Sequence, residues 1–129
     1  MKNSIIIPAY NEEKRSANFI PKLLSFVKKK IPNSEVIVVN DGSNDNTVSK
    51  VNSIIKSSKV SFARVIGYNK NKGKGNAVAY GVKAAKGDKI LFMDADGSIP
   101  SEEIPKLLKE LDKYDVVAGT RASARSKIK

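Results

Sequence analysis

Asp94 and Asp96 are the side chains in this sequence best suited to hold a metal ion. They directly follow a short apolar run, residues 89–93, and Gly97 comes next. Two carboxylates separated by one residue of extended backbone point to the same side. One or both can therefore reach a hard divalent cation that also binds phosphate oxygens. A turn-forming Asp at a polar strand end is the alternative, but the position directly after a buried strand favours the metal site.

Three further polar segments also follow apolar runs: residues 8–12 (PAYNE), 40–43 (NDGS) and 68–75. Asp41 fits either an acceptor for an N–H of a nucleotide base or a simple Asx turn before a helix. Glu12 fits the positive end of the following helix. For Tyr10 a core position is the preferred interpretation, with stacking on a base as the alternative.

Gly73, Lys74 and Gly75 suggest a phosphate-binding loop but match neither of the standard patterns. The glycine spacing before them is wrong for a Walker loop, and Asn76 stands where Ser or Thr should follow. Val78 occupies the position of the third glycine of a dinucleotide fingerprint. What remains is a basic loop entering a helix N-terminus, where an anion can bind.

The elements that must position these residues alternate between strand and helix. Unbroken apolar strands are expected at residues 3–7, 35–40, 61–67, 89–93 and 115–118. We expect one helix to begin after Asn18 as N-cap and a second to begin after Asp45 or Asn46. A third should end at Gly87, and a fourth should span residues 100–113. Apolar strands of this kind are buried on both faces, which predicts an α/β fold with a mostly parallel sheet flanked by helices. The carboxyl ends of such strands share one edge, where ligands bind.

The amino-acid composition limits the catalytic and binding chemistry available to the chain. The 129 residues suit a single domain, residues 1–129. With no His and no Cys, the chain has no thiolate nucleophile and no His general base, and any metal must be held by oxygen ligands. A net charge of +11 favours phosphorylated molecules and anionic lipid surfaces, with a solvated lysine-rich surface as the alternative. Few aromatic residues argue against a nucleic-acid partner. Neither a membrane-spanning run nor a signal peptide is visible, so we expect a cytoplasmic protein, or one bound peripherally to the cytoplasmic face of a membrane.

Five motifs, in order along the chain, resemble glycosyltransferase family 2. They are PAYNE (8–12), VVNDGSNDNT (38–47), NKGKGNAV (71–78), DKILFMDADG (88–97) and AGTRA (118–122). Within that family the sequence is similar to the dolichyl-phosphate glucosyl- and mannosyltransferases. The resemblance implies a Rossmann-like GT-A (nucleotide-diphospho-sugar transferase) fold. It also implies inverting transfer of a hexose from a UDP- or GDP-sugar to a polyprenyl phosphate.

The resemblance also implies roles for single residues. Asp94 and Asp96 would bind Mg²⁺ or Mn²⁺ on the donor diphosphate, with Asp96 and Arg121 catalytic. Arg121 and Arg125 would face the acceptor phosphate. The nucleotide-binding set would be Pro8, Tyr10, Glu12, Asp41, Lys74 and Asp94. One departure is Asn40, where the family commonly has Asp.

A lipid phosphate is already anionic, so the acceptor needs no strong general base, which fits a chain without His. Family members generally continue beyond this length, so we expect an incomplete catalytic domain, truncated on the acceptor side. An exposed sheet edge would then allow a homodimer. The alternative function is a non-catalytic nucleotide-sugar-binding domain that lacks the acceptor half.

Overall fold

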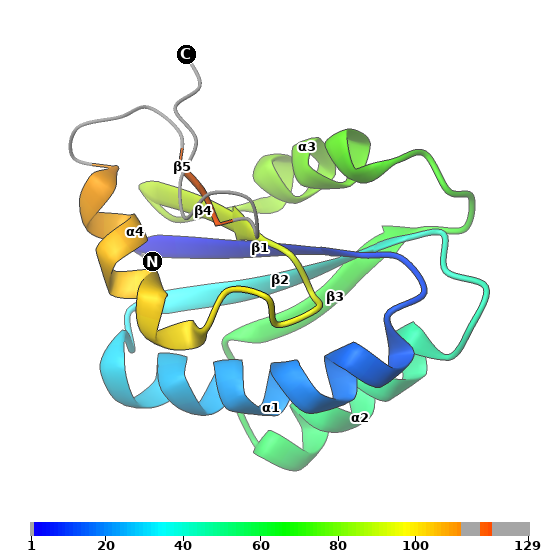
Figure 1. Ribbon diagram of the computed structural model, residues 1–129, viewed down its shortest axis with the longest axis horizontal. Helices are drawn as coiled ribbons and strands as arrows, with labels where there is room; N and C mark the ends of the chain where they lie inside the picture. Colours follow the sequence, from blue (N-terminus) through cyan, green and yellow to red (C-terminus); the bar gives the residue numbers. More distant parts are fainter. Residues whose placement is uncertain (1, 112–116, 120–129) are drawn as a thin grey trace.

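A five-stranded, entirely parallel sheet forms the centre of the protein (Figure 1). The computed structural model describes residues 2–111 and 117–119. The strands are β1 (Asn3–Ala9), β2 (Ser34–Asp41), β3 (Ala63–Tyr68), β4 (Lys89–Met93) and β5 (Val117–Gly119). Their order across the sheet is β3-β2-β1-β4-β5. The parallel α/β sheet expected from the apolar strands is therefore confirmed.

Helices cover both faces of the sheet. On one face lie α1 (Glu13–Lys30), α2 (Thr47–Ser58) and α4 (Ile104–Glu110), the last preceded by the 3₁₀ turn η1 (Ser101–Glu103). The helix α3 (Lys74–Ala84) lies on the opposite face (Figure 1). This layered arrangement buries the strands from both sides, which explains why their sequences lack polar alternation.

The central strand β1 shows how the two cores are separated. Ile5 and Ile7 belong to the core under α1, α2 and α4, whereas Ile6 belongs to the core under α3. Successive side chains of a strand point to opposite faces of the sheet. All three isoleucines are fully buried, so β1 is held from both sides.

The sheet topology fixes where a ligand can bind. The chain moves outward from β1 to β2 and β3, then returns through α3 to β4 on the other side of β1. The strand order therefore reverses between β1 and β4. In open parallel sheets the crevice outside the carboxyl ends of the strands at such a reversal is the usual ligand site. The loops that follow β1 and β4 both lie at that crevice.

The first helix begins earlier than the sequence suggests. Asn18 was expected as N-cap, but α1 starts at Glu13 with Glu12 at the N-cap position. The early N–H groups find acceptors on the β2–α2 loop and at the start of α2: Glu12 N–H donates to Thr47 Oγ1 at 3.0 Å and Glu13 N–H to Asp45 Oδ2 at 3.4 Å. These contacts stabilise the helix start without a local cap. Pro21, expected in the first turn, therefore lies inside the helix, on its exposed side.

Other element ends also differ from expectation. Asn46 is the N-cap of α2, but the side-chain hydrogen bond comes from Asp45, whose Oδ1 accepts the Thr47 N–H at 3.0 Å. The helix α3 ends at Ala84, before Gly87. A Cβ on Gly87 would lie 2.6 Å from the backbone of Asn3, so this glycine allows a close backbone approach instead. The helix expected over residues 100–113 opens as η1, and residues 112 and 113 lie outside the described part.

At the amino ends of the strands a buried carboxylate ties four segments together. Glu35, on β2, accepts hydrogen bonds from the Ser4 hydroxyl at 2.6 Å and the Lys86 N–H at 2.6 Å. Its other oxygen accepts from Arg64 at 3.0 Å. Burial raises the pKa of Glu35, but these three donors outweigh it and hold the pKa below its ordinary value. This cluster lies at the edge opposite to the ligand crevice.

Candidate functional site

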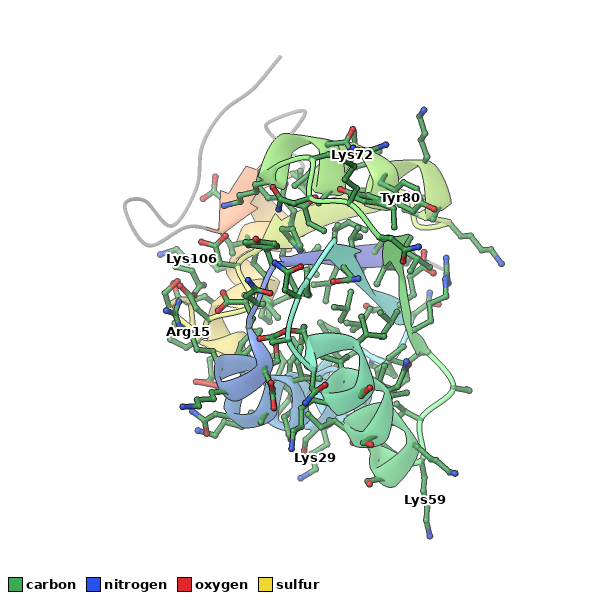
Figure 2. All side chains as sticks on the ribbon, turned by 90° about the vertical axis from the view of Figure 1, so that its right-hand side faces the viewer. Arg15, Lys29, Lys59, Lys72, Tyr80 and Lys106 are labelled. Carbon is green, nitrogen blue, oxygen red and sulfur yellow. The ribbon has the colours of Figure 1, made fainter. Side chains whose placement is uncertain are left out.

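The loops at the carboxyl ends of β1, β2, β3 and β4 line a cavity of about 460 Å³. Figure 2 looks onto this edge of the molecule, with Arg15 near α1 and Lys72 near α3. The cavity brings together all the sequence-predicted nucleotide and metal residues that the structure describes: Pro8, Tyr10, Glu12, Asp41, Lys74, Asp94 and Asp96. Arg121 and Arg125 lie outside the described residues. Asn71, which sequence reasoning did not select, also lines it.

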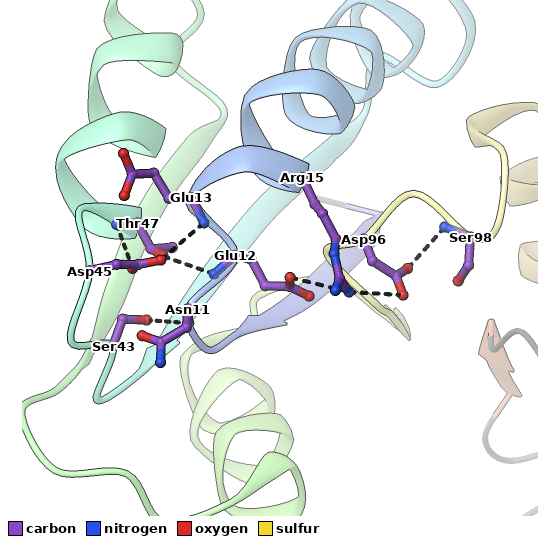
Figure 3. A network of polar contacts seen from close by, with 9 residues as sticks. All are labelled: Asn11, Glu12, Glu13, Arg15, Ser43, Asp45, Thr47, Asp96 and Ser98. Carbon is purple, nitrogen blue, oxygen red and sulfur yellow. Dashed lines mark hydrogen bonds and ion pairs between the residues drawn. The ribbon is translucent and has the colours of Figure 1, made fainter.

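Each aspartate of the β4 loop has a basic neighbour from another element. Lys74 Nζ, at the start of α3, lies 2.5 Å from Asp94 Oδ1. Arg15, on α1, lies 4.0 Å from Asp96 Oδ2 and 3.5 Å from Glu12 Oε1, as Figure 3 shows. The other Asp96 oxygen accepts the Ser98 N–H at 2.9 Å. The role of Arg15 could not be predicted from the sequence. Its spacing of three from Glu12 brings the two side chains together only if the helix begins at this position.

Negative charge accumulates at this end of the cavity. Burial raises the pKa of the Glu12 carboxyl, and Arg15 offsets part of this effect. The charges of Asp96 and Asp94 raise it further, so the pKa of Glu12 lies above its ordinary value. The neighbouring carboxylates thus add to the effect of burial, and a bound cation would offset the repulsion among them.

The carboxylate pair fits a hard divalent cation. Within residues 2–111 and 117–119, no group of three or more acidic, His or Cys side chains is arranged to hold a metal unaided. Asp94 and Asp96 nevertheless present oxygen ligands to one cavity in which acidic charge is concentrated. Mg²⁺ characteristically takes one or two carboxylates and completes its shell with phosphate oxygens and water. The pair therefore suits a cation that arrives with a phosphorylated ligand.

Asp41 is buried, with 3% of its surface exposed, and its carboxylate is already hydrogen-bonded within the protein. Oδ1 accepts from the Tyr68 hydroxyl and the Lys72 N–H, both at 2.8 Å. Oδ2 accepts from Asn71 Nδ2 at 2.9 Å and the Gly73 N–H at 3.0 Å. The simple Asx turn considered for Asp41 is not what its side chain makes.

The local turn contact is made by Asn40 and not by its neighbour Asp41. Its Oδ1 accepts the Ser43 N–H at 3.0 Å. Its Nδ2 points to the carbonyl of Tyr68 at 3.5 Å. The departure from the family pattern at this position is therefore compatible with a structural role in the loop.

Tyr10 is not a core residue. Its side chain is 43% exposed at the rim of the cavity, so the core interpretation is wrong and the ring is accessible to a ligand. On the opposite rim, Gly73 has φ of +99° at the N-cap of α3, a conformation that favours glycine. Gly73 has no side chain, so it cannot cap the N–H groups in the first turn of α3.

A parallel sheet flanked by helices, with acidic and basic loops at its carboxyl edge, defines an α/β protein with a candidate ligand site at the strand ends. Residues 4–129 match the family model described as glycosyl transferase family 2. The chain belongs to this family. The expected GT-A fold is confirmed by the solved structures below.

Two relatives and two structures illustrate the likeness. A dolichyl-phosphate beta-glucosyltransferase of Drosophila melanogaster is 42% identical, over 84% of this chain and 36% of its own length. An undecaprenyl-phosphate 4-deoxy-4-formamido-L-arabinose transferase of Pectobacterium atrosepticum is 33% identical, over 97% and 38%. S. aureus TarS 1-349 in complex with UDP-GlcNAc superposes with a TM-score of 0.68 at 28% identity, covering 89% of this chain and 32% of that TarS chain. The mannosyltransferase PcManGT of Pyrobaculum calidifontis, in complex with GDP-Man and Mn²⁺, gives 0.65 at 26%, covering 74% and 27%.

The chain thus spans little more than a third of the length of these curated relatives. In the part of the chain that the structure describes, no helix is both long enough and apolar enough to cross a bilayer.

Proposed function

We propose that the cavity binds a nucleotide sugar together with a divalent cation, and that the protein is an inverting hexosyltransferase. The donor is a UDP- or GDP-hexose (glucose or mannose) and the acceptor a polyprenyl phosphate such as dolichyl phosphate. The observation that carries this proposal is the convergence of Asp94, Asp96 and Lys74 in one cavity at the strand-order reversal. Carboxylates for a cation and a lysine for a phosphate are what a sugar diphosphate requires.

The residues divide into a diphosphate side and a base side. Asp94 and Asp96 would hold Mg²⁺ or Mn²⁺, which when bound supplies Lewis-acid stabilisation of the departing diphosphate. Lys74 and the N-terminus of α3 lie at the cavity and favour the negative charge of the same group. Pro8, Tyr10 and Glu12, on the β1 loop, border the remaining wall, where the exposed ring of Tyr10 can stack on a base.

The names of the relatives support a polyprenyl phosphate as acceptor, since they specify dolichyl and undecaprenyl phosphates. An oxygen of the lipid phosphate attacks the anomeric carbon as the bond from that carbon to the diphosphate breaks, inverting the configuration. The phosphate is already anionic, so no side chain has to remove a proton. Arg121 and Arg125 are proposed to hold this phosphate, at the cytoplasmic face of a membrane.

Calorimetry with Mn²⁺ and either UDP-glucose or GDP-mannose tests the proposal. We expect Mn²⁺-dependent binding of one donor, and its loss in Asp94→Asn. Asp88→Asn is the matched control, because Asp88 is exposed and lies directly before β4, at the opposite end of that strand from Asp94. Unchanged donor affinity in Asp94→Asn would refute the metal role. Binding without product formation from a polyprenyl phosphate would favour the non-catalytic nucleotide-sugar-binding alternative.

A further inference from the structure

We infer that Asn11 is a positioning residue for the nucleoside part of the donor. Its left-handed backbone, held by two hydrogen bonds to the β2–α2 loop, directs Tyr10 and Glu12 into the cavity. The inference rests on the proposed function, in which these two neighbours border the base side. Asn11 itself does not line the cavity. It therefore acts on the donor through Tyr10 and Glu12 and not by contact.

The backbone conformation of Asn11 is unusual for a residue with a side chain. Its φ is +53°, and among the residues that the structure describes Lys59 is the one other non-glycine residue with a positive φ. Lys59 ends α2, where a left-handed residue commonly closes a helix. Asn11 instead lies between β1 and α1, away from any helix C-terminus. Left-handed residues with side chains persist where the surrounding structure holds them, and they concentrate at functional sites.

Two hydrogen bonds hold this conformation from the neighbouring loop. The Asn11 N–H donates to Ser43 Oγ at 3.0 Å (Figure 3), and Asn11 Oδ1 accepts the Asn44 N–H at 2.8 Å. The pairing of β1 with β2 extends to Ala9 and Asn40, so these bonds continue the contact between two loops that leave the sheet side by side. Asn suits this position, because it tolerates positive φ better than most residues and its side chain supplies the acceptor.

The left-handed residue allows the chain to turn within a short connection. β1 ends at Ala9 and α1 begins at Glu13, which leaves residues 10–12 for the change of direction. Tyr10 is 43% exposed at the rim of the cavity, and the partly buried Glu12 lines it as well. A different φ at Asn11 would rotate Tyr10 relative to Glu12, because the two are joined through the Asn11 backbone. The conformation of this residue therefore sets where a ring and a carboxylate lie on the same wall.

Binding of two ligands by the same variant separates positioning from a general effect on the fold. Calorimetry with Mn²⁺ measures the affinity for UDP or GDP, whichever the wild type binds, and for inorganic pyrophosphate. Asn11→Ala loses the side-chain acceptor and disfavours positive φ. We expect it to weaken nucleotide binding about fivefold or more and to leave pyrophosphate binding within about twofold, because Asp94, Asp96 and Lys74 keep their places. Equal losses for both ligands, or unchanged nucleotide affinity, would overturn the inference.

Asn11→Gly distinguishes the contribution of the backbone from that of the side chain. Glycine adopts positive φ without steric cost, so this variant lacks the acceptor for the Asn44 N–H but can keep the turn. We expect its loss of nucleotide affinity to be smaller than that of Asn11→Ala. A loss as large as that of Asn11→Ala would show that the left-handed backbone is not what Asn11 supplies, and the inference would fail.

Ser43→Ala tests the contact from the other loop without a change in the turn itself. The variant removes the acceptor of the Asn11 N–H, while the backbone N–H of residue 43 can still donate to Asn40. Positioning predicts that nucleotide affinity falls about twofold to fivefold, because one hydrogen bond that holds the turn is lost. Ser57→Ala, at an exposed position near the end of α2, is the matched control and should bind the nucleotide as the wild type does. Wild-type affinity in Ser43→Ala would contradict the inference.

These experiments distinguish the inference from the proposed function. A wild-type chain that binds the nucleotide, with variants at Asn11 and Ser43 that bind it equally well, would refute the positioning role alone. A wild-type chain that binds neither UDP nor GDP would refute the proposed function and this inference together.

Discussion

Replacing Glu35 by Gln tests whether the scaffold at the amino ends of the strands is independent of the ligand site. The side chain is 2% exposed and accepts from three donors. Ser4 and Lys86 both donate to Oε2, so Gln can keep these two bonds by placing its one carbonyl oxygen there. Its amide group then faces Arg64, another donor.

The expected cost follows from this single mismatch. A hydrogen bond to a charged group contributes about 1.5–3 kcal/mol. Arg64 is 41% exposed and can turn to water, which discounts the loss. We therefore expect Glu35→Gln to lower the free energy of unfolding by about 1–2 kcal/mol at pH 7.

The cost should depend on pH in a definite direction. Because the pKa of Glu35 is lower in the folded protein than its ordinary value of 4.5, the ionised form stabilises the fold. That stabilisation is fully present above the ordinary value and disappears as the pH falls through the folded-state pKa. The difference between the wild type and Glu35→Gln should therefore shrink below pH 4.5.

Urea unfolding followed by circular dichroism at several pH values measures both effects. Glu102→Gln, an exposed carboxylate on η1, is the matched control and should change stability by less than about 0.5 kcal/mol. Donor affinity of folded Glu35→Gln should equal that of the wild type. A difference from the wild type that stays constant from pH 7 to pH 3 would refute the assigned role of the ionised carboxylate.

Three further variants test packing and the cation site. Gly81→Ala should destabilise the fold by about 1–2 kcal/mol in urea, because its Cβ would lie 2.5 Å from Ile6 Cγ2, which outweighs the better helix propensity; a more stable variant would contradict this packing. Leu23→Ala, at a fully buried position of α1, should cost about 2–5 kcal/mol by the same measurement, and a loss below 1 kcal/mol would be inconsistent with a packed core there. Arg15→Gln should strengthen Mn²⁺ binding to the donor-free protein about twofold to fivefold by electron paramagnetic resonance, since it removes the cation beside Asp96; unchanged affinity would show that Arg15 does not compete with the metal.

Much of the fold could be predicted from contiguous residues. The apolar runs identified the five strands that the structure describes, and the strand ends marked most of the residues that line the cavity, Asn71 being an exception. Burial on both faces of a parallel sheet produces these runs directly. The start of α1 could not be predicted in this way, because Asp45 and Thr47, which lie just before and at the start of α2, supply the acceptors that stabilise it.

The sequence by itself determined which chemistry is available: oxygen ligands at Asp94 and Asp96, a basic loop at Lys74, and no His or Cys. Only the tertiary structure decided how these groups are partnered. Asp41 is 31 positions from Lys72 along the chain, yet the register of β2 with β3 brings the two into hydrogen-bonding distance. Such a bond depends on strand pairing and burial rather than on local pattern. The sequence therefore left a base acceptor and a turn residue as alternatives for Asp41, whereas the structure shows its carboxylate bonded to the loop of residues 71–73.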